Sequence, residues 1–428
     1  MSMDQQRDKA IALVATLDTK GPETAYLKAR IEQRGFSTLI LDTGILEHRD
    51  PSAPEGQFPP EMIAAEGGAD LQELRLLFSE KGTRNKGIRA MAEGSARLLS
   101  RLYREGRFRG VIGIGGAQGT EICTAAMRAL PVGVPKIMVS TVASGKTPFG
   151  IYVGTRDLTI MHSVVDILGV NSWTRRILAN AAGAITGMCD IDPLPEESGR
   201  PRIGITIYGQ TTPGGMAVKA ALEEKGFEVI AFHPNGTGGR AMEEMAIEHF
   251  LDGLLDLTPH ELTDELFGGI HAGHPESSLS AGRVGIPRLL VPGVMEVMTM
   301  AEPETIPDAF RDHPRLPHNP HITLVRVSRE QMIQLGRVLG ERLNRSSGPV
   351  IVAIPRGGYS FYNRPGLLFH DPPADRAFVE VLKETLRRDI PVWELEGHIN
   401  DPEFAQALVP LFLDMMEHAG VRGIGVPQ

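Results

Sequence analysis

Two glycine-rich turns, each following a short apolar strand, are the segments of this sequence best suited to chemistry. The first is Gly115-Gly116-Ala117-Gln118-Gly119-Thr120 and the second is Gly236-Thr237-Gly238-Gly239-Arg240. Glycine lets backbone N–H groups approach a ligand closely, and a helix start carries partial positive charge, so such turns favour phosphate or carboxylate. Glycine also makes tight turns between strand and helix without any ligand. Two such turns, each with a threonine hydroxyl, favour a bound anion.

Two further turns place polar side chains directly after predicted strands. Asp18-Thr19-Lys20 follows the first strand of the chain, and Thr211 with Thr212 follows the first strand of the second half. In an open parallel sheet, ligands bind at the C-terminal ends of strands near a topological switch point. We therefore count these residues among the candidate nucleotide or phosphate ligands. Which half of the chain holds the nucleotide stays open.

The segment 140–147 resembles a P-loop only in part. Ser140 stands where a glycine is needed, and Pro148 follows at the point where a helix would have to begin. Its donors are Ser140, Thr141, Ser144 and Gly145. If the third and fourth strands are neighbours, these donors and Gly115-Gly116 would face one pocket.

Other candidate residues give weaker signals. His318 and Asn319 precede an apolar strand, and Arg356 follows one at a third glycine-rich exit. A histidine there suits acid–base work or phosphate binding, although a hydrogen bond to a nearby backbone carbonyl is its more common role. Plain turn chemistry with an exposed arginine explains Arg356 equally well. The histidines between His271 and His398 lack the spacing of metal ligands. Both cysteines, Cys123 and Cys189, lie in apolar stretches. The sequence therefore predicts no metal site.

Short apolar runs alternate with helical patterns, which predicts parallel sheets with helices on both faces. The predicted strands are Ile11–Leu17, Thr38–Asp42, Gly110–Ile114, Lys136–Ser140, Ala184–Met188, Ile203–Tyr208, Glu228–Phe232, Gly253–Leu257, Arg288–Val291, Ile322–Val327, Val350–Ile354 and Val392–Leu395. The fold class is therefore α/β, with two Rossmann-like domains that each contain a mainly parallel sheet.

The predicted domains are residues 1–190 and 201–428, joined by a proline-rich, charged linker at 190–201. Two matching segments, Leu27–Phe36 and Val218–Phe227, support similar domains. A long excursion at 47–87 separates the second and third strands, and excursions of this length are typical of lids, interface arms or disorder.

The composition sets broad limits on partners. The chain has 428 residues and a net charge of −9, with no basic stripe, which argues against nucleic acid as a partner. No apolar run is long enough to span a membrane, and the first residues do not form a signal peptide. We expect a cytoplasmic protein without a membrane partner.

Together these motifs resemble a bacterial, fungal and plant family that includes the tomato mosaic virus resistance protein. The resemblance rests on Leu17–Gly21, Gly113–Thr120, Met138–Gly145, Asn180–Met188, Phe232-His233, Gly238–Glu243, His318–Pro320 and His398–Asp401. It implies two Rossmann-like subdomains, binding of ATP, and a homodimer. In plants a TIM-barrel domain follows, so the resemblance implies that this chain works alone or with a separate TIM-barrel partner protein.

We expect the chain to bind ATP or a related nucleotide, with Mg²⁺ as a companion ion. One hypothesis is an ATP-dependent enzyme that acts on a small organic acid in the cleft between domains. The alternatives are a non-catalytic, nucleotide-responsive module that docks other proteins, and a small-acid enzyme that uses no nucleotide. The sequence does not identify catalytic residues.

Overall fold

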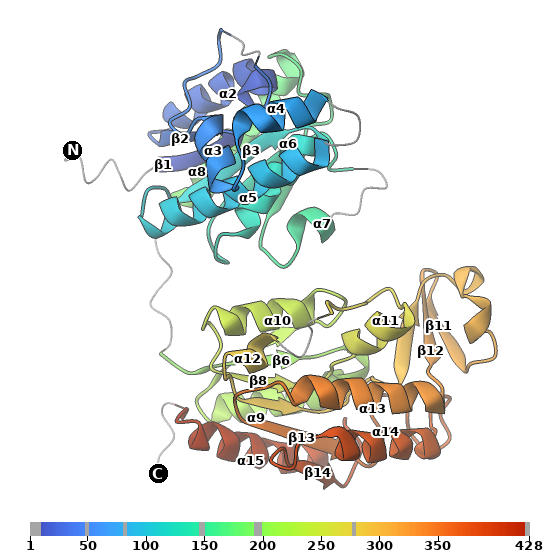
Figure 1. Ribbon diagram of the computed structural model, residues 1–428. Coiled ribbons are helices and arrows are strands. Elements are labelled where there is room, and N and C mark those ends of the chain that lie inside the picture. Colours follow the sequence, from blue (N-terminus) through green and yellow to red (C-terminus); the bar gives the residue numbers. More distant parts are fainter. Residues whose placement is uncertain are drawn as a thin grey trace. The chain divides into compact units, whose positions relative to one another are not determined.

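The computed structural model describes residues 10–47, 51–79, 84–144, 150–191, 199–275 and 280–423. The chain divides into two compact units, residues 1–194 (unit 1) and residues 195–428 (unit 2). Each unit is built on its own parallel sheet (Figure 1). The predicted fold class, α/β with two Rossmann-like domains, is confirmed.

Unit 1 contains a five-stranded sheet in the order β2-β1-β3-β4-β5, with all neighbours parallel. Its strands are β1 (Ala10–Ala15), β2 (Ser37–Asp42), β3 (Gly110–Gly115), β4 (Lys136–Ser140) and β5 (Thr159–His162). The chain moves from β1 to β2 on one side and then crosses to β3 on the other. The topological switch point therefore lies between β1 and β3.

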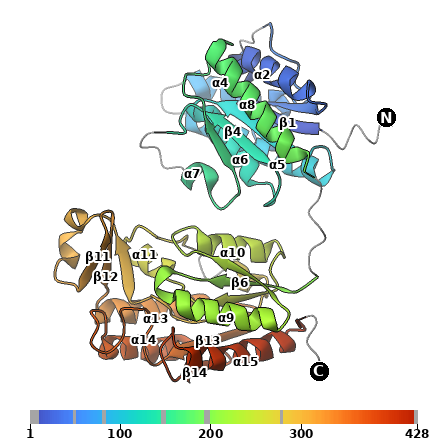
Figure 2. The same cartoon turned by 180° about the vertical axis from the view of Figure 1, so that it is seen from behind.

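Helices cover both faces of this sheet. They are α2 (Leu17–Glu32), α3 (Pro60–Glu66), α4 (Leu71–Ser79), α5 (Arg84–Arg104), α6 (Ala117–Arg128), α7 (Gly150–Val153) and α8 (Ser172–Cys189). Because side chains alternate along a strand, Ala12 and Val14 of β1 face α3 to α6, whereas Ile11 and Leu13 face α2 and α8. Figure 1 shows α5 in front of the sheet, and Figure 2 shows α8 in front.

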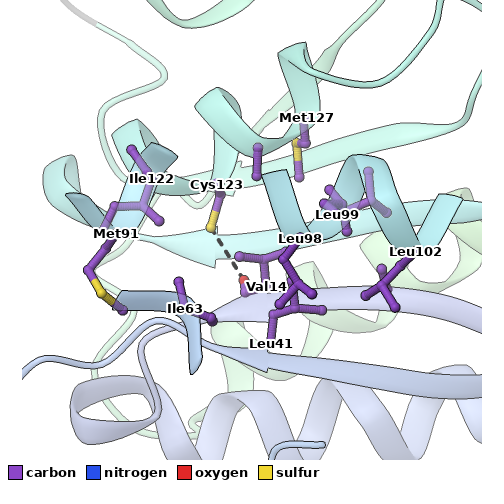
Figure 3. Close-up of a cluster of buried hydrophobic side chains, with 14 of the residues drawn as sticks. Val14, Leu41, Ile63, Met91, Leu98, Leu99, Leu102, Ile122, Cys123 and Met127 are labelled. Atoms are coloured by element: carbon purple, nitrogen blue, oxygen red, sulfur yellow. Dashed lines mark hydrogen bonds between the residues drawn. The ribbon is translucent and has the colours of Figure 1, made fainter. Parts of the chain in front are cut away.

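The core on the α5–α6 side contains one of the two cysteines. Cys123 of α6 packs among Val14, Leu98 and Ile122, and its thiol donates a hydrogen bond to the carbonyl of Val14 at 3.3 Å (Figure 3). Burial raises the pKa of the Cys123 thiol to about 12 and that of Cys189 to about 12. Both thiols are therefore buried and protonated at neutral pH.

Two expectations for unit 1 are corrected. The excursion at 47–87 forms α3 and α4 and the start of α5, and its Ile63 and Leu74 are buried in the core because these helices are amphipathic. The predicted strand Ala184–Met188 lies inside α8, which begins at a capping box formed by Asn171 and Thr174. Within that run Ile185 and Thr186 are buried, so one face of the helix lies against the rest of the unit.

Unit 2 contains a six-stranded parallel sheet in the order β14-β13-β9-β8-β6-β7. Its strands are β6 (Arg202–Thr206), β7 (Glu228–Phe232), β8 (Gly253–Asp256), β9 (Arg288–Leu290), β13 (Val350–Pro355) and β14 (Val392–Leu395). We can count the strands of this sheet from the β7 edge. The first five are then the second, first, third, fourth and fifth sheet strands along the chain, which is the same order as in unit 1. The switch point of unit 2 therefore lies between β6 and β8.

A small antiparallel sheet interrupts the parallel pattern. It is formed by β10 (Val297–Met300), β12 (Ile322–Arg326) and β11 (Arg315–Asn319). The predicted strand Ile322–Val327 exists, but it pairs antiparallel in this insertion. The sequence of a short apolar strand is the same whether it pairs parallel or antiparallel, so its periodicity could not predict the direction of pairing.

The helices of unit 2 also cover both faces of its parallel sheet. They are α9 (Thr212–Glu224), α10 (Gly238–Ile247), α11 (Glu261–Phe267), α12 (Ser280–Arg283), α13 (Arg329–Leu343), α14 (Pro372–Thr385) and α15 (Pro402–His418). Short 3₁₀ turns occur at Gly209–Thr211, Pro303–Thr305 and Asp308–Phe310. Figure 1 shows α10 and α13 in front of the sheet, and Figure 2 shows α9 in front. Across the described residues, no helix combines the length and apolar character needed to cross a membrane.

Candidate functional site

A cavity of about 410 Å³ lies at the switch point of unit 1. Its wall combines the turn after β1, the turn after β2 and the start of α6. The lining residues are Thr16, Asp18, Thr19, Lys20, Thr43, Ile45, Leu46, Ile88, Gly116, Ala117, Gln118, Gly119 and Ile122. The volume falls within the range of small-molecule sites, and the position is where open α/β sheets bind ligands.

Backbone donors face this cavity at the start of α6. Gly116 is the N-cap residue, and it provides no side-chain cap. Thr120 donates its N–H to the Gly116 carbonyl at 2.8 Å. Among the residues that the structure describes, the N–H groups of Ala117, Gln118 and Gly119 have no acceptor. A helix start with three open donors favours an anion.

Packing within the protein requires glycine at Gly115 but not at the other glycines of this turn. A Cβ on Gly115 would lie 2.7 Å from the Cα of Gly119, so close packing of the strand end against α6 demands glycine there. A Cβ on Gly119 would meet its nearest atom at 3.5 Å, and one on Gly116 at 3.7 Å. Packing within the described chain therefore leaves these two positions open.

Two polar atoms without partners lie beside these donors. Asp18 accepts the N–H groups of Ile45 and Leu46 through Oδ2, both at 2.9 Å, which ties the turn after β2 to the start of α2. Its Oδ1 and the hydroxyl of Thr43 are buried atoms that lack a hydrogen-bond partner among the described residues. A ligand hydroxyl or a hydrated cation would satisfy both.

The residues predicted from the sequence divide into those that line the cavity and those that do not. Asp18, Thr19, Lys20, Gly116, Gln118 and Gly119 line it. Among the described residues Lys20 is the only cationic side chain of the lining, and its ammonium donates to the carbonyl of Ile167.

The predicted donors after β4 lie outside this lining, although β3 and β4 are neighbours. The hydroxyls of Thr120 and Ser140 are fully buried and bond to each other at 2.7 Å, so they join α6 to β4. Ser144 bonds instead to His162 at 3.1 Å. Thr141 is half-buried beside Gly116, and Gly145 lies outside the described residues.

Sequence reasoning missed Thr16 and Thr43, which both line the cavity. For Thr43 the available signal was its position directly after the predicted strand Thr38–Asp42. Thr16 lay inside the predicted strand Ile11–Leu17, whereas β1 ends at Ala15. Ile88 also lines the cavity, from α5.

The second glycine-rich turn is already occupied by a side chain of the protein. The Glu261 carboxylate accepts the N–H of Gly236 at 2.7 Å and that of Gly239 at 3.3 Å. Thr237 bonds to Asn235 at 3.2 Å, and Arg240 forms an exposed ion pair with Glu244 at 2.7 Å. This corrects the expectation of free donors, because an internal carboxylate takes the place of the ligand.

Packing also explains the glycines of this turn and the threonines after β6. A Cβ on Gly238 would clash with the carbonyl of His233, and one on Gly239 with Glu261. The Thr211 hydroxyl is buried against that of Thr258 at 2.8 Å, and Thr212 bonds to the Tyr208 carbonyl at 3.1 Å. The Gly214 N–H of α9 donates to Asn400 at 3.1 Å.

A cluster of histidines and one aspartate lies at the carboxyl edge of the unit 2 sheet. One ligand atom from each of His260, Asp264 and His271 lies within 4.8 Å of the other two. The carboxylate of Asp264 accepts the N–H groups of His271 and Thr299, both at 2.9 Å. The Tyr208 hydroxyl lies 3.3 Å from Nδ1 of His271 and 3.4 Å from the Thr299 hydroxyl.

Burial dominates the electrostatics of this edge. It lowers the pKa of His260 to about 4 and that of His271 to about 4, so both imidazoles are neutral at pH 7. It raises the pKa of Asp264 to about 7 and that of Glu261 to about 7. Burial also raises the pKa of Tyr208. These shifts are typical of functional sites, although buried structural groups show them too.

The remaining predicted residues are scattered over unit 2. His318 and Asn319 are exposed on β11, where the Asn319 side chain accepts the N–H of His321 at 2.8 Å. Arg356 pairs with Glu396 at the rim of a cavity of about 290 Å³ beside β13 and α14. None of these three residues lines the unit 1 cavity or belongs to the His260 cluster.

Two family models match the chain. Residues 9–193 match the N-terminal domain, and residues 200–416 match the C-terminal domain, of the uncharacterised protein family UPF0261. The solved structure of UDP-N-acetylglucosamine 2-epimerase from Rickettsia bellii is 11% identical, with a TM-score of 0.23 over 66% of this chain and 78% of that chain. The assignment of the fold therefore depends on the two parallel sheets described above, and not on this similarity.

Curated relatives agree with these models. A UPF0261 protein of Clostridium tetani is 38% identical over 416 residues, which cover 96% of this chain and 100% of the relative. The tomato (Solanum lycopersicum) ToMV resistance protein Tm-1(GCR237) is 32% identical over 432 residues, which cover 97% of this chain and 57% of the tomato protein. The chain therefore belongs to the uncharacterised protein family UPF0261.

Proposed function

We propose that unit 1 binds a nucleotide, ATP together with Mg²⁺, in the cavity between β1 and β3. The observation that carries this proposal is the open start of α6, where the N–H groups of Ala117, Gln118 and Gly119 face a cavity without an acceptor among the described residues. A phosphate group satisfies several such donors at once.

Comparison of the two units favours unit 1 as the nucleotide site. Both sheets share the same strand order around the switch point. In unit 2 the glycine-rich turn after β7 has its donors satisfied internally by Glu261, and the Gly214 N–H at the start of α9, after β6, is satisfied by Asn400. In unit 1 the donors remain open, and the nearby positions 116 and 119 leave room for a ligand.

The charge of the lining supports a companion cation. A polyphosphate brings negative charge to a cavity that already contains Asp18, while the ammonium of Lys20 is engaged by a carbonyl. Mg²⁺ is bound in proteins by one or two carboxylates together with phosphate oxygens. In the proposed complex, the partnerless Oδ1 of Asp18 accepts from a water molecule of the hydrated ion.

Calorimetric titration of the full chain with ATP, with and without Mg²⁺, tests the proposal. Gly119→Val places a side chain over the open donors and should weaken ATP binding by at least about tenfold, since a charged hydrogen bond contributes about 1.5–3 kcal/mol. Gly187→Val controls for the glycine-to-valine change itself, because Gly187 also lies inside a helix, α8, but is exposed and has nothing within 4 Å of a Cβ. Equal ATP affinity in both variants, with the fold intact by circular dichroism, would refute the site.

The same titration separates the part played by the cation. Asp18→Asn keeps an oxygen that can accept the N–H groups of Ile45 and Leu46, but it removes the charge. We expect this variant to lose the increase in affinity that Mg²⁺ gives and to keep the affinity measured without Mg²⁺. Release of ADP in the presence of small carboxylic acids then distinguishes an ATP-dependent enzyme from a non-catalytic, nucleotide-responsive module.

A further inference from the structure

We propose that unit 2 holds a divalent transition-metal ion between His260, Asp264 and His271. These three residues, the metal triad, are distinct from the nucleotide cavity of unit 1 and belong to a different sheet. Their ligand atoms lie within 4.8 Å of one another, and Nε2 of His260 is 3.7 Å from Oδ2 of Asp264. The proposal replaces the sequence-based expectation of no metal.

The distances are close to those of a filled site. Imidazole nitrogens and carboxylate oxygens bind zinc at about 2.0–2.2 Å, so two ligands of one ion are at most about 4.4 Å apart. The separations in the triad are within 4.8 Å, so none exceeds this limit by more than a few tenths of an ångström. Small side-chain rotations close that gap.

The donor set selects the class of metal. Two imidazoles with one carboxylate are typical ligands of zinc and of ferrous iron, whereas magnesium and calcium prefer oxygen alone. Three protein ligands leave a coordination position open, which is the arrangement of catalytic rather than structural zinc sites. The partly exposed His271 gives that position access to solvent.

The backbone around the triad is built to bring its members together. His260 precedes α11 and Asp264 lies one turn later, so both face the same side. The chain leaves α11 through Gly268, whose φ of +82° suits glycine. A Cβ on Gly269 would clash with the Asp264 carboxylate, so glycine there lets the chain fold back and deliver His271.

The surroundings of the triad hold its members in place without supplying an opposite charge. The Thr299 hydroxyl lies 3.0 Å from Nε2 of His260, and the Thr299 N–H bonds to Asp264. Asp264 is fully buried, yet its hydrogen-bond donors in the described structure are backbone N–H groups rather than a lysine or arginine. A buried carboxylate without a cationic partner is costly, and a divalent ion would provide that partner.

Metal titration of the full chain, after chelator treatment and dialysis, tests the proposal. We expect one equivalent of Zn²⁺ to bind by calorimetry, and one equivalent of Co²⁺ to give a visible absorption band. Replacing a mere hydrogen-bond partner of a metal ligand reduces affinity by about 10–100-fold. Loss of a ligand in His271→Ala should therefore weaken Zn²⁺ binding by about 100-fold or more and abolish the Co²⁺ band.

Two further variants complete the experiment. Asp264→Asn keeps the shape of the side chain and should also weaken Zn²⁺ binding, which guards against a folding defect in one variant alone. His418→Ala is the matched control, because His418 also lies 3.5 Å from an aspartate, Asp414, but both are exposed on α15. Zn²⁺ binding that is absent from the parent, or equal in His271→Ala and His418→Ala, would overturn the assignment.

Discussion

The carboxylate of Glu261 lies 2.7 Å from the backbone nitrogen of Gly236, in the position where a bound phosphate would lie. The turn therefore binds an anion, as its glycines suggest, but the anion is a side chain of the same protein. This relationship leads to the first prediction.

We expect Glu261→Ala to create a phosphate site in unit 2. The variant frees the half-buried N–H groups of Gly236 and Gly239, which should lower stability by about 1 kcal/mol, the typical net contribution of a hydrogen bond. Added inorganic phosphate should then raise the melting temperature, because it binds only the folded form. The measurement uses a Gly119→Val background, so that the unit 1 cavity does not contribute.

Glu261→Gln is the control for this experiment. It keeps an oxygen over the two donors, so phosphate should leave its melting temperature unchanged. A phosphate response of equal size in both variants would contradict the view that the carboxylate occupies the anion position.

We expect Arg240→Ala to leave ATP affinity unchanged. Arg240 is exposed and pairs with Glu244 at 2.7 Å, and exposed pairs of this kind contribute at most about 1 kcal/mol. The melting temperature should therefore shift only slightly. A tenfold loss of ATP affinity by calorimetry would instead restore the second glycine-rich turn as a phosphate site.

Gly115→Ala and Gly116→Ala should separate packing from ligand binding. The added methyl at position 115 meets the Cα of Gly119 at 2.7 Å and forces α6 away from β3, which should cost about 1–3 kcal/mol. At position 116 the nearest atom is 3.7 Å away and φ is −78°, so stability should hardly change. Thermal unfolding of both variants without ligand checks this difference, and equal destabilisation would contradict it.

The fourth prediction concerns the buried Glu296. Burial raises the pKa of this carboxyl from 4.5 to about 7, although Arg326 acts in the opposite direction. The native state therefore holds the proton more tightly than the unfolded state, and the contribution to the free energy of unfolding falls as the pH rises from about 4.5 to about 7.

Glu296→Gln should remove this pH dependence. At pH 8 we expect the variant to be more stable than the parent, by up to about 3 kcal/mol, since one pKa unit corresponds to about 1.4 kcal/mol. At pH 4 the two proteins should have nearly equal stability. Melting temperatures from calorimetry at both pH values test this, and a difference independent of pH would argue for a steric effect.

Much of the parallel framework could be predicted from the sequence, because most of its strands are short apolar runs bounded by turn residues. The strands Lys136–Ser140, Glu228–Phe232 and Val392–Leu395 have the predicted bounds. By contrast, β5 contains only two adjacent apolar residues, Ile160 and Met161, which is too short a run to predict a strand. Ala184–Met188 reads as a strand because small and β-branched residues also suit a helix that lies against a sheet.

Only those residues of the candidate site that directly follow a strand could be predicted from the sequence. Gly116 and Gly119 follow a strand, and they line the cavity. The sequence could not show that Glu261, more than twenty residues after Gly236, fills the second turn, because that contact depends on how α11 packs. The metal triad was missed for a similar reason, since a bend at Gly268 and Gly269 brings His271 to Asp264.

Glu261 is covalently part of the chain, so its carboxylate competes with free anions for the N–H groups of the second turn. Its effective concentration there is determined by the folded backbone, which holds it next to the turn. For tethered groups this concentration commonly reaches the millimolar range even with flexible connections, and it does not fall when the protein is diluted. A free anion of ordinary affinity cannot match a competitor that never diffuses away. We therefore expect the second turn to be insensitive to the phosphate level of its surroundings. The first turn lacks such a tethered competitor among the described residues, so the proposed nucleotide site would respond to that level.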